Sequence, residues 1–201
     1  QACKANTPSA GGIGTLGEKT HHAVLKRYYV PHGENHEVKI GGYVADIVGE
    51  QGIIEIQTRN FDKLRGKLAA FLPAARVTVV YPVAGLKWLC WVDKQSGEVT
   101  KKRKSPRKGS MYDVIPELYK IRPFLFHENL TVAVPVLELT EYRYLDGWSR
   151  DKKKGSTRCD RIPQALLCEY RFSAPEDYRQ FVPQSLPAEF DSGEFAKGAG
   201  C

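Results

Sequence analysis

Apolar and polar residues alternate most clearly between Tyr43 and Thr58. Two runs rich in β-branched residues flank the sequence Gly49-Glu50-Gln51-Gly52, which has the composition of a tight turn. This pattern predicts an antiparallel hairpin whose turn is centred on Glu50 and Gln51. The alternation also predicts which side chains share a face, because successive residues of a strand point to opposite sides of a sheet.

The predicted register brings two acidic residues together. With the turn at Glu50 and Gln51, Val48 pairs with Ile53 and Asp46 lies opposite Glu55, so two carboxylates would stand about 5 Å apart on one face. Gln57 shares that face. Like charges in an apolar setting are unfavourable unless a cation compensates them, which predicts an oxygen-preferring divalent metal such as Mg²⁺. The opposite face is expected to carry Tyr43, Ala45, Ile47, Ile54 and Ile56.

The periodicity predicts further elements on both sides of the hairpin. A helix is expected from Thr15, where Thr15 and Glu18 form a capping box, to a point before Pro31. The other expected elements are a strand at 36–40, a helix at 61–71 capped by Asn60, a buried parallel strand at 75–81, a hairpin of 86–92 with 98–101, a helix at 110–121 and a strand at 130–139 with Pro135 at an edge or bulge. Residues 141–184 give no clear pattern. Residues 189–200 resemble the opening helix of a helix-turn-helix, capped by Ser192 or Asp191.

The composition is that of a globular protein with one well-filled core. The 201 residues are 42% hydrophobic and 26% charged. No apolar run is long enough to cross a bilayer and the first residues lack the apolar core of a signal peptide, so we expect a cytoplasmic protein without membrane contact. The five cysteines form no C-x-x-C pair, which predicts free thiols and argues against a zinc site.

The net charge of +7 is concentrated in two clusters, 101–108 and 150–154. Basic clusters attract polyanions, but the same composition is also typical of any solvated loop. The two histidines at 21 and 22 point about 100° apart on a helix, so they cannot easily bind one ion together. We interpret them as surface residues or as supporting residues of a site.

The order of the first elements resembles a known nuclease fold. From Thr15 to Tyr81 the expected order is helix, strand, strand with Asp46, strand with Glu55-Ile56-Gln57, helix, strand, which is similar to the αβββαβ core of the PD-(D/E)XK nuclease superfamily. Ala45-Asp46 matches the acidic position of that motif, and Glu55-Ile56-Gln57 matches E-x-K. The resemblance implies an α/β fold, restriction-endonuclease-like, with a mixed central sheet flanked by helices and additional strands.

The C-terminal pattern is similar to a prokaryotic family that carries a nuclease-like domain before a winged helix. The resulting division is a disordered tail at 1–12, a PD-(D/E)XK nuclease-like domain with extensions at 13–184 and the start of a truncated helix-turn-helix or winged-helix module at 185–201.

The resemblance implies a Mg²⁺ or Mn²⁺ site made by Asp46, Glu55 and the backbone carbonyl of Ile56. Glu18 would support this site or hold a second metal, although it could equally serve only the capping box. Gln57 departs from the motif, because an amide has no proton equilibrium and cannot act as a base in place of lysine. A glutamine can still orient the attacking water by hydrogen bonding.

The implied activity is metal-dependent phosphodiester hydrolysis in DNA, with DNA as the partner and a homodimer left open. One alternative is a non-catalytic nucleic-acid-binding or regulatory protein that retains the nuclease fold. Another is a protein-interaction domain in which the basic loops serve only solvation. For Asp46 and Glu55 themselves the alternative is that both point to solvent from an edge hairpin. Basic residues expected to contact phosphates, unless they form solvated faces, are Arg59, Lys63, Lys67, Lys101, Lys102, Arg103, Lys104, Arg107, Lys108, Lys152, Lys153 and Lys154.

Overall fold

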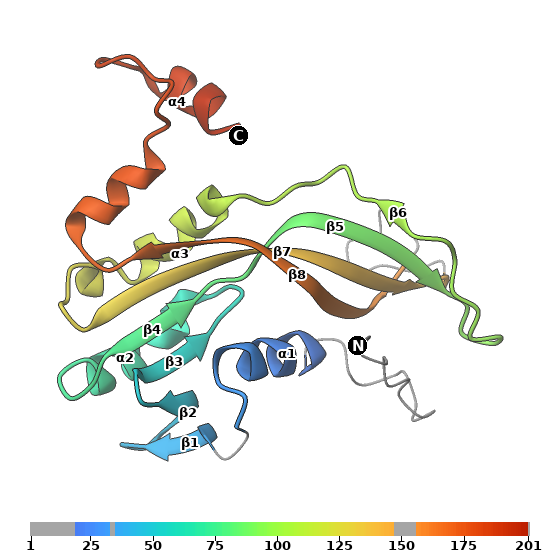
Figure 1. The fold of residues 1–201 in the computed structure, drawn as a ribbon, viewed down its shortest axis with the longest axis horizontal. Coiled ribbons are helices and arrows are strands. Elements are labelled where there is room, and N and C mark those ends of the chain that lie inside the picture. Colours follow the sequence, from blue (N-terminus) through green and yellow to red (C-terminus); the bar gives the residue numbers. More distant parts are fainter. Residues whose placement is uncertain (1–18, 33–34, 147–155, 201) are drawn as a thin grey trace, which may run out of the picture.

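An eight-stranded mixed sheet forms the frame of the chain (Figure 1). The computed structural model describes residues 19–32, 35–146 and 156–200. The strands are β1 (His36–Ile40), β2 (Tyr43–Gly49), β3 (Gly52–Ile56), β4 (Val77–Val80), β5 (Val83–Val92), β6 (Arg103–Lys104), β7 (Leu130–Tyr144) and β8 (Arg158–Phe172). The helices are α1 (Lys19–Tyr29), α2 (Arg65–Phe71), α3 (Ile115–Lys120) and α4 (Ser192–Ala199), with short 3₁₀ helices at Phe61–Leu64, Met111–Val114, Arg122–Phe124 and Pro175–Phe181.

The long strand β7 organises the sheet. Its first half pairs in parallel with β4, its second half pairs in parallel with β5, and β8 runs antiparallel along its other edge. Outward from the first half of β7 the order is β4, β3, β2 and β1, so β1 is the edge strand. On the second half, β6 follows β5. The hairpin of β2 and β3 and the strand β6 therefore lie at opposite ends of β7, as Figure 1 shows.

Helices cover both faces of the sheet. Leu25 of α1 packs with Ile47, Ile56, Val80, Ala133 and Leu137, whereas Leu68 and Phe71 of α2 pack with Ile53, Val77, Val79, Val132 and Val134. Neighbouring residues of β4 and β7 enter different clusters, because side chains alternate along a strand. Thus α1 lies on one face and α2 on the other.

The hairpin has the predicted register. Val48 pairs with Ile53, Ile47 pairs with Ile54, and Gly49 faces Gly52 beside the turn. Gly52 has a φ of 108°, and a Cβ there would collide with the carbonyl oxygen of Arg76. Only glycine fits this turn position, because other residues rarely adopt such a φ.

Several sequence predictions need correction. Asn60 is left-handed and makes no side-chain cap, and the N–H of Phe61 is bound instead by Glu117 Oε2 at 2.8 Å. Pro135 is buried in the middle of β7 rather than at an edge or bulge, and it falls between Ala133, the last partner of β4, and Val136, the first partner of β5. Pro135 takes part in neither the β4 nor the β5 ladder, and it pairs with Glu169 of β8. The strand β8 was not predicted at all.

Other expectations agree with the described residues or lie outside them. The helix α4 begins after Asp191, whose side chain accepts from the N–H of Glu194. None of the described cysteines forms a disulfide, and no described helix is long and apolar enough to span a membrane. The predicted tail at 1–12, the capping box of Thr15 and Glu18, and the basic residues at 150–154 all lie outside the described residues. The expected helix-turn-helix module at 185–201 stays a prediction.

Candidate functional site

The two acidic residues of the hairpin meet where β2 and β3 separate. The ladder ends at the pair Ile47 and Ile54, and one position further Asp46 Oδ2 accepts a hydrogen bond from the N–H of Ile56 at 2.8 Å. The carboxylate of Asp46 thus takes the place that a backbone carbonyl of a paired strand would occupy. It reaches across to β3, where Ile56 directly follows Glu55.

Glu55 is a buried carboxylate with one strong partner. Its residue is only 2% exposed, and Oε2 accepts from Lys67 Nζ of α2 at 2.7 Å. Burial raises the pKa of Glu55 and the negative charge of Asp46 adds to this rise, whereas the Lys67 ammonium and the backbone N–H of Asp46 oppose it. The other oxygen, Oε1, is buried and has no hydrogen-bond partner among the described residues. Glu55 therefore retains an unused acceptor inside the site.

Asp46 is approached from the other face of the sheet by Lys26 of α1. Lys26 is a buried lysine whose Nζ lies 3.8 Å from Asp46 Oδ1 and 3.1 Å from Glu37 Oε1. Glu37 has a φ of 57°, in the left-handed region that a residue other than glycine rarely adopts. Backbone strain of this kind costs on the order of 1–3 kcal/mol and often marks a functional site. Two lysines thus flank the carboxylates, one from each face.

Gln57, the departure from the nuclease motif, is fixed at the end of β3. Its Nε2 donates to the carbonyl oxygen of Arg59 at 2.6 Å, and its backbone N–H donates to Val80 O at 2.9 Å. An ammonium is nevertheless present at the site, because Lys67 binds Glu55 from α2. Sequence reasoning assigned Lys67 to phosphate contact only and overlooked Lys26. The signal for both was a lysine next to a core leucine of an amphipathic helix, Lys26 after Leu25 and Lys67 before Leu68.

The remaining predicted residues lie elsewhere. Arg59 and Lys63 are exposed near the site, and Lys101, Lys102, Arg103 and Lys104 are exposed at the far end of the sheet. Arg107 and Lys108 are also exposed, but they precede Gly109, whose N–H donates to Ala84 O near the start of β5 at 2.8 Å. Strand β6 pairs with Trp88 and Leu89, which pair in turn with Thr140 and Glu141 of β7. Between Ala133 and Thr140 the strand rises by about 23 Å, at about 3.3 Å per residue. The basic loop and the carboxylates therefore do not form one cluster, and Glu18 and Lys152–Lys154 lie outside the described residues.

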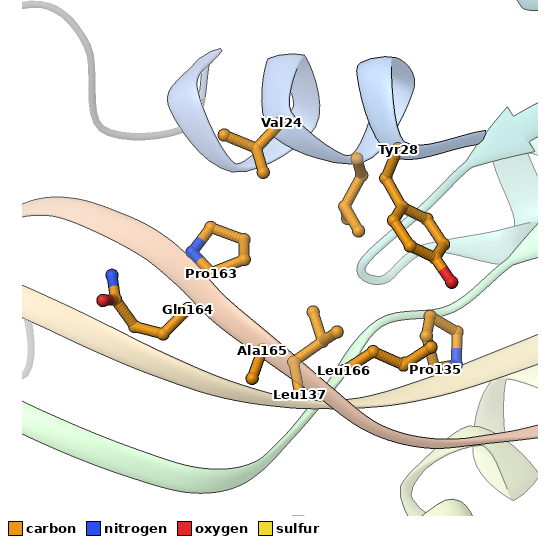
Figure 2. A pocket seen from close by; sticks show the side chains of 9 residues that line it. Val24, Tyr28, Pro135, Leu137, Pro163, Gln164, Ala165 and Leu166 are labelled. Atoms are coloured by element: carbon orange, nitrogen blue, oxygen red, sulfur yellow. The ribbon is translucent and has the colours of Figure 1, made fainter. Parts of the chain in front are cut away.

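An apolar cavity between α1 and β8 is a separate feature (Figure 2). Its volume is about 150 Å³. Val24 and Tyr28 of α1 face Pro163, Ala165 and Leu166 of β8 across it, and no charged side chain is in its lining. Such a lining offers nothing to bind a phosphate or a metal, so the candidate site remains at Asp46 and Glu55. No group of three or more His, Cys, Asp or Glu side chains that could hold a metal occurs in the described part of the chain.

Comparison with known proteins places this chain in a family. Residues 19–173, from α1 to the end of β8, match the family described as "Domain of unknown function (DUF8091)". The chain belongs to this family. A relative from Treponema pallidum (strain Nichols), which carries the name "Uncharacterized protein", is 31% identical over 186 residues, covering 92% of this chain and 74% of the relative. No solved structure matches the chain. The DUF8091 match includes Asp46 and Glu55 and ends before α4.

Proposed function

We propose that this DUF8091 protein is a metal-dependent DNA endonuclease that hydrolyses a phosphodiester bond at Asp46 and Glu55. The order of α1, β1, β2, β3, α2 and β4 supports the proposal, since it is the αβββαβ order of the PD-(D/E)XK core. The antiparallel hairpin and the parallel pairing of β3 with β4 are consistent with that core. The restriction-endonuclease-like fold is part of this proposal.

The observation that carries the proposal is the unused oxygen of Glu55 beside Asp46. A buried carboxylate oxygen without a partner costs about 1–3 kcal/mol, so a fold that retains one gains from a ligand at that position. Mg²⁺ fits this donor set, because it is commonly held by one or two carboxylates together with water and substrate phosphate. The residues that would hold it are Asp46, Glu55 and the carbonyl of Ile56. When bound, Mg²⁺ or Mn²⁺ would act as a Lewis acid toward the phosphate oxygens.

Lys67, Gln57 and Lys26, which surround the two carboxylates, each have a different role in the proposed reaction. Lys67 holds Glu55 in place and offers a positive charge to the scissile phosphate, which the motif normally takes from its own lysine. Gln57, held by its bond to Arg59, orients the attacking water through its amide. Lys26 positions Asp46 and limits the repulsion between the two carboxylates.

One observation favours the alternative of a non-catalytic nucleic-acid-binding protein. Each carboxylate already has an ammonium partner, Lys26 for Asp46 and Lys67 for Glu55. These two charges can balance the pair without a metal. In that case the site is a structural remnant of the nuclease fold, and the exposed basic residues bind DNA without cleavage.

Nicking of DNA with matched variants separates the two functions. The purified protein is incubated with supercoiled, linear, branched and single-stranded DNA in Mg²⁺, Mn²⁺ or EDTA, and binding is measured in parallel. We expect metal-dependent cleavage that is lost in Asp46→Asn and Glu55→Gln and retained in Glu50→Gln, an exposed acidic residue of the same hairpin. DNA that is bound but never cut would reject the enzymatic function in favour of the alternative.

A further inference from the structure

A second charged cluster surrounds Glu141 in the distal half of β7. Glu141 is 0% exposed, and three cationic side chains reach its carboxylate. Oε1 accepts from Arg143 Nε at 2.7 Å, with Arg143 Nη2 at 2.6 Å. Oε2 accepts from Arg161 Nε at 2.8 Å, and Lys87 Nζ lies 3.9 Å from it. The cluster joins β5, β7 and β8.

The cluster has more positive charge than one carboxylate can balance. Although burial would raise the pKa of Glu141, the charges of Arg161 and Lys87 hold it below its ordinary value, so Glu141 is ionised at neutral pH. Burial is the largest cause that lowers the pKa of Lys87, and the charges of Arg161 and Arg143 add to it against the opposing charge of Glu141. Three cations around one carboxylate leave two positive charges, whose mutual repulsion an added anion would relieve.

Hydrogen-bond donors of this cluster remain open for a ligand. Arg161 binds Glu141 through Nε, and among the described contacts its two Nη groups have no acceptor. The side chains of Arg161 and Arg143 are 32% and 28% exposed, so an anion from solvent can reach them. A guanidinium presents its donors in a planar fork that matches phosphate oxygens.

An independent observation comes from His21 on α1. The residue is 6% exposed, and its buried Nε2 has no hydrogen-bond partner among the described residues. Burial, followed by the charges of His22, Arg161 and Arg158, lowers the pKa of His21 to about 4. Its neutral ring thus keeps an unused polar atom, on which the charge of Arg161 acts. The carboxylate of Asp160 also lies nearby, where it accepts from the backbone N–H of Arg161 at 2.7 Å.

The cluster lies further along the sheet than the candidate active site. Ile56 is level with Val80 and Ala133, and Glu141 follows Ala133 by eight residues of β7, which corresponds to about 26 Å at about 3.3 Å per residue. A nucleic acid that reaches both places would therefore run along β7.

We propose that Arg161, Arg143 and His21 form an anion site for a backbone phosphate of the same nucleic acid whose scissile phosphate lies at Asp46 and Glu55. Glu141 balances part of the positive charge of the two guanidinium groups and so lowers the affinity for the anion. The inference rests on the proposed function, because it assigns the substrate contacts of the same DNA-binding face.

DNA binding at several salt concentrations tests the site without cleavage. The measurement uses the Asp46→Asn protein in EDTA and short duplex and single-stranded DNA, so loss of catalysis does not affect it. Arg161→Gln should weaken binding and reduce the slope of log K against log salt by about 1. Arg161→Lys should keep that slope. Arg171→Gln is the matched control, because Arg171 lies on the same strand in a one-to-one pair with Glu169 at 2.9 Å.

Glu141→Gln separates an anion site from a purely structural network. Removing the carboxylate increases the positive excess, so DNA binding should tighten even where thermal stability falls. A structural network predicts lower stability with unchanged or weaker binding, and that result would overturn the proposal. An unchanged salt slope in a folded Arg161→Gln protein, checked by circular dichroism, would overturn it as well, even if the wild type cleaves DNA.

Titration of His21 by NMR distinguishes the source of the phosphate. DNA should raise the pKa of His21 above its value of about 4, because a nearby anion favours the charged imidazole. If inorganic phosphate raises it while DNA does not, the site belongs to a small phosphate compound and the backbone assignment is wrong. If neither ligand shifts it, His21 is not part of an anion site.

Discussion

The pair of Lys67 and Glu55 allows a quantitative prediction about stability. Lys67→Met removes the ammonium 2.7 Å from Glu55 but keeps a stem of similar shape. Glu55, at 2% exposed, cannot recover its hydration in the folded state. Removing one partner of a buried ion pair typically costs about 3–5 kcal/mol, because an uncompensated charge is left behind.

Protonation of Glu55 limits this cost. The ordinary pKa of the carboxyl is 4.5, and burial raises it in the folded protein. Protonation of Glu55 at pH 7 costs about 1.4 kcal/mol for each of the about 2.5 pH units above its ordinary pKa, or about 3.5 kcal/mol in total, which sets an upper limit on the loss. The unfolded state releases its proton at lower pH than the folded variant does, so stability falls as the pH rises above 4.5. We expect Lys67→Met to lose about 3 kcal/mol at pH 7 and about 1 kcal/mol at pH 5.5.

Urea denaturation followed by tryptophan fluorescence at these two pH values measures the effect. Lys67→Arg keeps the charge and should retain most of the stability. Lys63→Met changes an exposed lysine just before α2 and should have little effect at either pH. Adding Glu55→Gln to Lys67→Met should abolish the extra loss at pH 7. An equal loss at both pH values would refute the reasoning, because it would assign the effect to packing rather than charge.

Three further predictions concern the same chain. Between pH 6.5 and about 4, the His21 imidazole binds a proton in the unfolded state but not in the folded state, which destabilises the folded wild type by about 3 kcal/mol. His21→Phe should remove this loss, and denaturation at pH 7 and 4.5 compares the variant with wild type. Gln57→Lys should not raise the single-turnover cleavage rate, because Lys67 already supplies an ammonium at Glu55; a rate increase would show that Lys67 lacks this role. Replacing Lys102 and Lys104 by glutamine should reduce the salt slope of DNA binding by about 2 if the basic loop contacts phosphates; an unchanged slope would make it a solvated loop.

Local patterns were sufficient to predict the hairpin and its register. The turn glycines and the alternating side chains lie within sixteen residues of one another, and Val48 does pair with Ile53. The parallel strand β4 was predicted for a similar reason, since a short apolar run after a helix is typical of a buried parallel strand.

Long-range contacts account for what the sequence did not predict. The presence of Pro135 predicted an edge strand or a bulge. In the structure it lies in a buried strand, in the gap between the β4 and β5 ladders, and no local pattern encodes that gap. The ammonium groups at the carboxylates come from other elements, Lys26 from α1 and Lys67 from α2. Likewise, Glu141 and Arg161 are twenty residues apart and meet only when β7 pairs with β8.

Single-turnover cleavage of DNA by wild type and Glu55→Gln, with Mg²⁺ added stepwise, shows whether Glu55 belongs to a metal-dependent cleavage site. We expect no cleavage without metal, a rate that saturates with Mg²⁺, and a loss of at least about a hundredfold in Glu55→Gln, since metal-assisted catalysis contributes several kcal/mol. Cleavage that persists in a folded Glu55→Gln protein, or a wild type that binds DNA without cutting it at any Mg²⁺ concentration, would rule out such a site.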